Sequence, residues 1–219
     1  MLIGQFELPI AFDLAATFLL AVTGALVAMR KGYDFVGVFF LALITGTGGG
    51  LLRDGLFLQQ VPAVLGSPYV IVVVVAMAIG MVFGERLNRP VMVFMLVDAA
   101  GLGIYAMVGA QKALNLGLGW GAALLIGVIN AVGGGLVRDV ITRDHPMVFR
   151  PGEFYAAAAF MGCVVFIALA MGLRLPAETA ALAGIATTLL VRFGSVRFGW
   201  RTRAVQALIR DDDRPTDGE

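Results

Sequence analysis

The sequence is poor in charged residues. Asp, Glu, Lys and Arg make up 14% of its 219 residues, whereas a soluble domain carries about a quarter. Apolar residues make up 59%, and the mean hydropathy is +0.91. A surface with so little charge is unsuited to water, so the composition predicts an integral membrane protein.

Cysteine and histidine are also scarce, with one residue of each, Cys163 and His145. A single cysteine excludes an intrachain disulfide, and its place in an apolar run predicts a small buried packing residue. We identify no partners that would make His145 a metal ligand. Paired catalytic carboxylates, a nucleophile–base set and a phosphate-binding loop are absent from the sequence, which therefore predicts neither an enzyme nor a bound cofactor or metal.

Long apolar runs fill most of the chain. A membrane-spanning helix needs about 20 mainly apolar residues, and short polar or Gly/Pro breaks divide this sequence into runs of that length. The first run lacks the basic start and cleavage site of a signal peptide, so we expect a retained helix. The fold class predicted is an all-α membrane protein of seven transmembrane helices, at about 9–29, 35–58, 68–84, 90–110, 120–142, 153–172 and 177–193.

Basic residues gather on one side of this seven-helix arrangement. They lie at 30–31, 86, 89, 143 and 150 and, from the end of the last helix onward, between 192 and 214, while the other side holds Lys112 and Arg174. Basic loops stay in the cytoplasm, so we expect the N-terminus outside and the C-terminus inside. Residues 192–203, where aromatic residues alternate with arginines, indicate a helix end that rests on anionic lipid and does not bind nucleic acid.

The sequence repeats itself after 85 residues. This shift aligns 13–54 with 98–139 without a gap, giving 14 identities in 42 positions, among them two copies of Gly-Gly-Gly-Leu-x-Arg-Asp. Three helices separate equivalent points, so the second copy crosses the membrane in the opposite direction, as in transporters with inverted repeats. We therefore expect two three-helix repeats at 1–89 and 90–174, a seventh helix at 175–203 and a polar cytoplasmic tail at 204–219.

A triglycine lies inside the second and the fifth predicted helix. Each glycine costs about 1 kcal/mol of helix stability relative to alanine, so three in a row predict a helix that is kinked or opened there. The freed carbonyl groups would coordinate a cation or an ionic substrate. The alternative is close helix packing, as in Gly46-x-x-x-Gly50. The candidate residues are Gly48, Gly49, Gly50, Thr45 and Thr47 in one copy and Gly133, Gly134, Gly135 and Asn130 in the other.

Charged residues inside membrane spans mark functional sites and have partners nearby. Helical rise places Asp13 and Arg53 at similar depth near one membrane face, and Asp98 and Arg138 near the opposite face. We therefore expect Asp13–Arg53 and Asp98–Arg138 ion pairs, which either line a pathway or only hold helices together. Two further candidates are Asp54 and Asp139, which would extend to the membrane interface or cap a helix break.

The doubled motif, the 3+3+1 helix plan and the length resemble the trimeric intracellular cation (TRIC) channel family, in its prokaryotic branch. The resemblance covers about 12–193. It implies a homotrimer in the bacterial inner membrane, with a pore in each protomer that passes the glycine-kinked second and fifth helices. The implied permeant ion is monovalent, K⁺ or Na⁺ and chiefly potassium, and Thr45, Thr47 and Asn130 would line the wall. Related bacterial sequences are also described as a glycine-transporter domain.

Two functions are therefore open. In a passive cation channel, carbonyl groups and acidic side chains would select the ion, and fixed arginines would set a barrier or a gate. In a secondary transporter of a small zwitterion such as glycine, Arg53 or Arg138 would bind the carboxylate and an aspartate the amine. Inverted repeats suit both, and the resemblance favours the channel.

Overall fold

The computed structural model describes residues 7–88, 91–150 and 154–200. Most of these residues lie in helices, and no strand occurs among them. Within these ranges, seven helices are long and apolar enough to cross a membrane. The predicted tail at 204–219 and the basic residues beyond 200 lie outside the described residues.

The predicted spans are confirmed to within a few residues, except that the fourth runs on to Asn115 and the seventh to Phe198. Two of the seven end in a π-helical turn, and two 3₁₀ turns lie in the loops. In chain order the elements are α1 (Ile10–Arg30), α2 (Phe35–Leu51), η1 (Leu52–Phe57), η2 (Ala63–Leu65), α3 (Ser67–Asn88), α4 (Val91–Asn115), α5 (Gly119–Ile141), η3 (Met147–Phe149), α6 (Tyr155–Ile167), η4 (Ala168–Gly172) and α7 (Ala177–Phe198).

Local sequence signals set the helix ends. Asp34 caps α2 by accepting a hydrogen bond from the backbone N–H of Gly37 at 2.8 Å. Gly32 and Gly117, which are equivalent in the repeat, follow α1 and α4 with φ angles of 72° and 74°. Only glycine adopts such angles without strain, so the same tight turn recurs on opposite sides of the protein.

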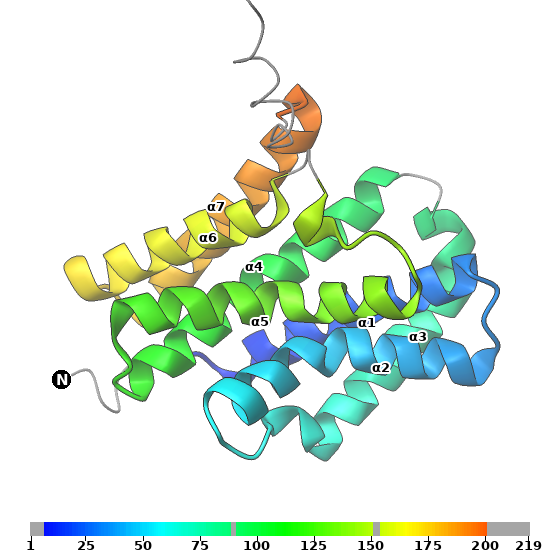
Figure 1. The fold of residues 1–219 in the computed structure, drawn as a ribbon, viewed down its shortest axis with the longest axis horizontal. Helices are drawn as coiled ribbons and strands as arrows, with labels where there is room; N and C mark the ends of the chain where they lie inside the picture. The colour runs from blue at the N-terminus through cyan, green and yellow to red at the C-terminus, as the bar shows by residue number, and fades with distance from the viewer. Residues whose placement is uncertain (1–6, 89–90, 151–153, 201–219) are drawn as a thin grey trace, which may run out of the picture.

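The six repeated helices pack as two interlocked triplets (Figure 1). Across the repeat boundary α1 contacts α4 and α2 contacts α5, while α3 lies against α1 and α2, and α6 against α4 and α5. The seventh helix packs on α4 and α6. We call the end of the bundle where α1 begins the N-side, and the end where α7 finishes the C-side.

The opening expected at the triglycines does not occur, whereas a kink there stays a prediction. The α-helical assignment is unbroken through 48–50 in α2 and through 133–135 in α5, and the irregular π turn of α2 begins later, at Leu52. The alternative, close packing, describes the structure. A Cβ atom on Gly49 would overlap the carbonyl oxygen of Asn130, and one on Gly134 would overlap that of Thr45. The two helices therefore cross backbone to backbone, about the axis that relates the repeats.

This crossing generates a stability prediction. Gly49→Ala should lower the unfolding free energy by about 1–3 kcal/mol, the usual effect of overpacking. Gly48→Ala is the matched control, because its Cβ would lie at an ordinary 3.5 Å from the Cα of Gly134. Thermal melting of both variants in detergent measures the difference, and equal melting temperatures would contradict the crossing.

Candidate functional site

Near the N-side, one guanidinium group holds two carboxylates. Arg53 lies in η1 and is fully buried. Its Nε donates to Oδ1 of Asp54 at 2.6 Å, and its Nη2 lies 3.2 Å from Oδ2 of Asp13 on α1. Tyr69 of α3 donates its hydroxyl hydrogen to the same Asp13 oxygen at 3.1 Å. Together with Lys112 these residues form what we call the N-side cluster, which joins four helices.

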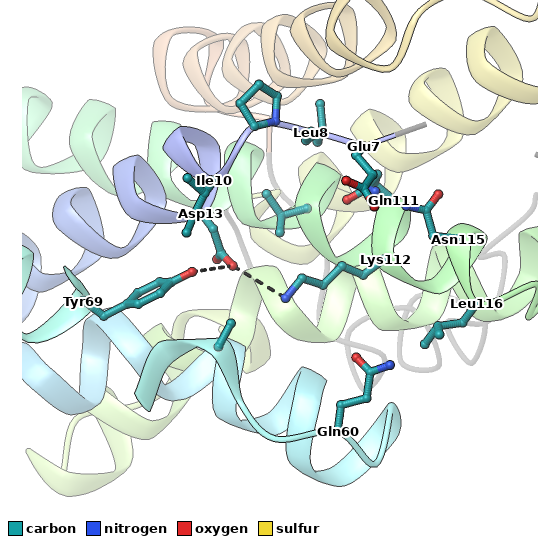
Figure 2. A pocket seen from close by; sticks show the side chains of 13 residues that line it. Glu7, Leu8, Ile10, Asp13, Gln60, Tyr69, Gln111, Lys112, Asn115 and Leu116 are labelled. Atoms are coloured by element: carbon teal, nitrogen blue, oxygen red, sulfur yellow. Dashed lines mark hydrogen bonds and ion pairs between the residues drawn. The ribbon is translucent and has the colours of Figure 1, made fainter. Parts of the chain in front are cut away.

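A cavity of about 410 Å³ ends at this cluster (Figure 2). Asp13, Tyr69 and Lys112 lie on its wall, and the ammonium group of Lys112 is 3.3 Å from Asp54 and 3.7 Å from Asp13. The other polar residues lining the cavity are Glu7, Gln60, Gln111 and Asn115. A polar cavity of this size holds several waters, so the N-side cluster lies at the end of a hydrated recess.

The repeat produces a matching group near the C-side. Arg138 of α5 is 1% exposed; its Nε donates to Asp139 at 2.9 Å and its Nη1 donates to Asp98 of α4 at 3.0 Å. The same Nη1 donates to the hydroxyl of Thr23 on α1, also at 3.0 Å. We call Asp98, Arg138, Asp139 and Thr23 the C-side cluster. The ion pairs expected between Asp13 and Arg53 and between Asp98 and Arg138 are thus present.

Asp54 and Asp139 do not extend to the membrane interface as the sequence analysis allowed. They are 1% and 6% exposed and pair with the arginine that precedes them. Each also accepts a hydrogen bond from the first backbone N–H of the 3₁₀ turn that follows, from Ala63 and from Met147, both at 3.1 Å. The aspartates therefore tie each arginine to the loop that covers it.

Polar side chains continue between the two clusters. Tyr105 of α4, which is fully buried, donates to the carbonyl oxygen of Gly46 at 2.6 Å and lies 2.6 Å from Oγ1 of Thr17. Asn130 of α5 donates through Nδ2 to the carbonyl oxygen of Tyr105 at 2.6 Å. Thr45 and Thr47 are buried and return their hydroxyl hydrogens to their own helix. A polar axis thus runs between the repeats.

Several buried oxygens on this axis make no hydrogen bond. Within the described residues, Oδ1 of Asn115, Oδ1 of Asn130, Oδ2 of Asp98 and the hydroxyl of Tyr155 are such atoms. An unsatisfied buried acceptor costs about 1–3 kcal/mol, which water or a cation would recover. A site with three or more His, Cys, Asp or Glu side chains that could hold a metal ion is not found in that part of the chain.

At the C-side surface an ion pair joins the two repeats. Nζ of Lys31, just after α1, lies 2.6 Å from Oδ1 of Asp144, after α5. The hydrogen bond from Lys31 lowers the pKa of Asp144 below its ordinary value, with help from the hydroxyl of Thr142. Because the pair is about a third exposed on each side chain, it adds little stability.

Sequence reasoning missed three members of the clusters, Thr23, Tyr69 and Lys112, and also Tyr105, which lies between the clusters. Tyr69, Tyr105 and Lys112 lie on helices other than the one that carries the Gly-Gly-Gly-Leu-x-Arg-Asp motif. Their repeat equivalents at 154, 20 and 27 are apolar. Comparing the two repeats therefore did not single out these three residues.

Removing either buried arginine should be strongly destabilising. Arg53→Gln leaves Asp13 and Asp54 with Lys112 as their one remaining partner of opposite charge. Arg138→Gln takes from Asp98 and Asp139 the guanidinium that pairs with both. Breaking a buried ion pair in this way costs about 3–5 kcal/mol. Arg143→Gln is the control, because Arg143 is exposed on the C-side. Melting temperature and ion flux are measured on the same preparations. If Arg53→Gln and Arg138→Gln both kept wild-type stability and full flux, the buried ion pairs would matter neither for folding nor for transport.

The surface pair gives a pH prediction. Its lysine favours the charged carboxylate, so the pKa of Asp144 is depressed and the pair's contribution is lost as pH falls through that value. Lys31→Gln should raise the pKa of Asp144 toward about 3.9. Carboxyl ¹³C NMR of aspartate-labelled protein in micelles measures the shift, and an unchanged titration would show that Lys31 does not act on this group.

Comparisons with known proteins agree with the repeat. The model of a family described as "Glycine transporter" matches residues 10–85 and 95–171, two segments whose starts are 85 residues apart. The UPF0126 inner membrane protein YadS of Escherichia coli (strain K12) is 34% identical over 189 residues, which cover 85% of this chain and 90% of that protein. A UPF0126 membrane protein of Vibrio cholerae is 37% identical over 190 residues, covering 85% of this chain and 78% of that protein.

Solved structures share the whole fold. The TRIC trimeric intracellular cation channel orthologue from Rhodobacter sphaeroides superposes with a TM-score of 0.81 at 33% identity, covering 87% of this chain and 98% of that one. A second structure, described as "Structural basis for conductance through TRIC cation channels", superposes with a TM-score of 0.79 at 30% identity. The match covers 89% of this chain and 95% of that one. The chain therefore belongs to the glycine transporter (UPF0126) family of membrane proteins and is a prokaryotic relative of the TRIC channels.

Proposed function

We propose that this protein is a cation channel that conducts monovalent cations, chiefly potassium, through a path between the two repeats of each protomer. The observation that carries the proposal is the buried polar axis, which has one arginine–carboxylate cluster toward each side and unsatisfied oxygens along it. The similarity to proteins described as cation channels supports the same reading.

The chemistry of this axis suits a cation. A permeating ion needs oxygens that replace part of its hydration shell. The cavity supplies water and Asp13 at the N-side, Oδ1 of Asn130 lies at the middle, and Oδ2 of Asp98 lies toward the C-side. Each cluster also holds an arginine, whose fixed positive charge opposes a passing cation and so limits the current.

On this proposal the path is closed. Tyr105 fills the centre with a fully buried ring, and Arg53 and Arg138 are held on both sides of it. Conduction therefore requires motion of α2 against α5, where glycine contacts offer little side-chain interlock. The π turn at Leu52–Phe57 carries Arg53, and such turns occur frequently at functional sites.

Assembly and orientation complete the proposal. Relatives of this fold are described as trimeric, which supports a homotrimer with membrane lipids around it. The C-side carries Arg30, Lys31, Arg143, Arg150 and Arg197 among the described residues, and the positive-inside rule assigns that side to the cytoplasm. In this reading the 410 Å³ cavity opens to the outside.

A secondary transporter of glycine is the second candidate. The family description favours it, and so does a cavity whose wall carries both an ammonium group and carboxylates. A zwitterion would bind its carboxylate at Lys112 and its amine at Glu7 or Asp13. Against this reading, the ammonium of Lys112 is already paired with Asp13 and Asp54.

The two candidates are separated by flux into proteoliposomes. We expect a potassium conductance with discrete unitary currents, and no saturable uptake of labelled glycine from the same preparation. Arg143→Gln protein should behave as the wild type, because that side chain is exposed and outside both clusters. Saturable, gradient-driven glycine uptake without unitary currents would overturn the channel and recast the cavity as a substrate site.

A further inference from the structure

Lys112 is the one basic group of the N-side cluster that water reaches. Its side chain is 28% exposed, whereas those of Asp13, Arg53 and Asp54 are exposed by 7% or less. Figure 2 shows its ammonium group reaching Asp13 from the wall of the cavity. Lysine carries a compact charge on a flexible chain, and the cavity gives the ammonium water to move into.

The C-side cluster shows what happens without such a lysine. The repeat position equivalent to Lys112 is Val27, which is 9% exposed and lies in an apolar core. Asp98, Arg138 and Asp139 nevertheless form the same arginine–carboxylate pairs as their N-side counterparts. The lysine is therefore not needed to build the cluster, and its presence at the cavity calls for another role.

Charge balance points to that role. Asp13 and Asp54 carry two negative charges, and Arg53 neutralises one of them. Lys112 supplies the other positive charge, with its ammonium within 3.3 Å of Asp54. Withdrawing Lys112 leaves one unbalanced negative charge on this pair of aspartates, of which Asp13 lines the cavity. A monovalent cation of oxygen-preferring type restores the balance, whereas a divalent cation exceeds it.

We propose that Lys112 is a tethered cation that occupies the N-side binding position of the permeant ion and so restrains conduction. When the ammonium swings into the cavity, a potassium or sodium ion takes its place on Asp13 and Asp54. The inference rests on the proposed channel function and adds to it a residue that sets how readily ions are admitted from the N-side.

Neutral and charged replacements test this directly. Lys112→Met should raise potassium conductance about fivefold, the effect of removing one unit charge about 4 Å away in water. Lys112→Arg keeps the charge and should keep the wild-type conductance or lower it. Lys31→Gln removes a lysine from an ion pair outside the path and serves as the control. An unchanged or reduced conductance in folded Lys112→Met overturns the proposal.

Chemical modification tests it without relying on a variant's folding. The sequence contains two lysines, Lys31 and Lys112. In a Lys31→Arg background, an acetylating reagent therefore neutralises Lys112 after the protein has folded, and mass spectrometry verifies the site. Conductance should rise on acetylation. The Lys31→Arg/Lys112→Arg protein controls for reaction at the N-terminal amine, and an equal rise in that protein contradicts the proposal.

A binding measurement separates this inference from the channel itself. Melting temperatures are compared in potassium chloride and in N-methylglucamine chloride at equal ionic strength. Potassium should stabilise Lys112→Met more than the wild type, because ligand binding to the folded state raises its stability. If potassium stabilises the variant but no form conducts, the channel function fails and the cation site stands. If conductance is present but potassium stabilises both proteins equally, the role of Lys112 fails alone.

Discussion

The structure depends on two guanidinium groups buried inside a membrane protein. Arg53 and Arg138 are each nearly inaccessible to water, and a buried charge is tolerated only when it is paired and hydrogen bonded. Each therefore binds an aspartate from a neighbouring helix and the aspartate next to it in sequence, and that second aspartate holds the following 3₁₀ turn. One requirement, charge satisfaction, thereby fixes the helix positions, the loop geometry and the polar path between the repeats.

Duplication of the three-helix unit explains why an arginine–carboxylate cluster occurs near both the N-side and the C-side. An inverted repeat places equivalent residues at opposite depths, and the backbone crossing of Gly49 and Gly134 brings the two copies together at the centre. Function requires departures from this symmetry as well. Lys112 has no charged equivalent in the first copy, and α7 has no counterpart at all. The two mouths of the proposed path therefore differ in charge although they share a motif.

The sequence predicted what repeats and periodicity encode. Seven spans, the inverted plan and the pairs formed by Arg53 and Arg138 followed from apolar length, the 85-residue shift and depth. The sequence did not predict the features that depend on contacts between helices. Helix propensity predicted a kink or an opening at the triglycines, but α2 and α5, which pack on each other, stay α-helical through them. Tyr105 was missed because its role depends on how α4 is rotated about its own axis. All the helices that contact α4 set this rotation, which turns the Tyr105 hydroxyl toward Gly46.

The central claim, a cation path between α2 and α5, is tested most directly at Asn130, which is buried on that axis. Asn130→Cys is made in a Cys163→Ala background, which removes the native cysteine, and potassium current is recorded while a small cationic thiol reagent is applied. The account predicts that modification reduces the current and that potassium slows the reaction. Leu125→Cys on the same helix, where the side chain is 58% exposed, should be insensitive. An unchanged current after complete modification at 130 would contradict the path.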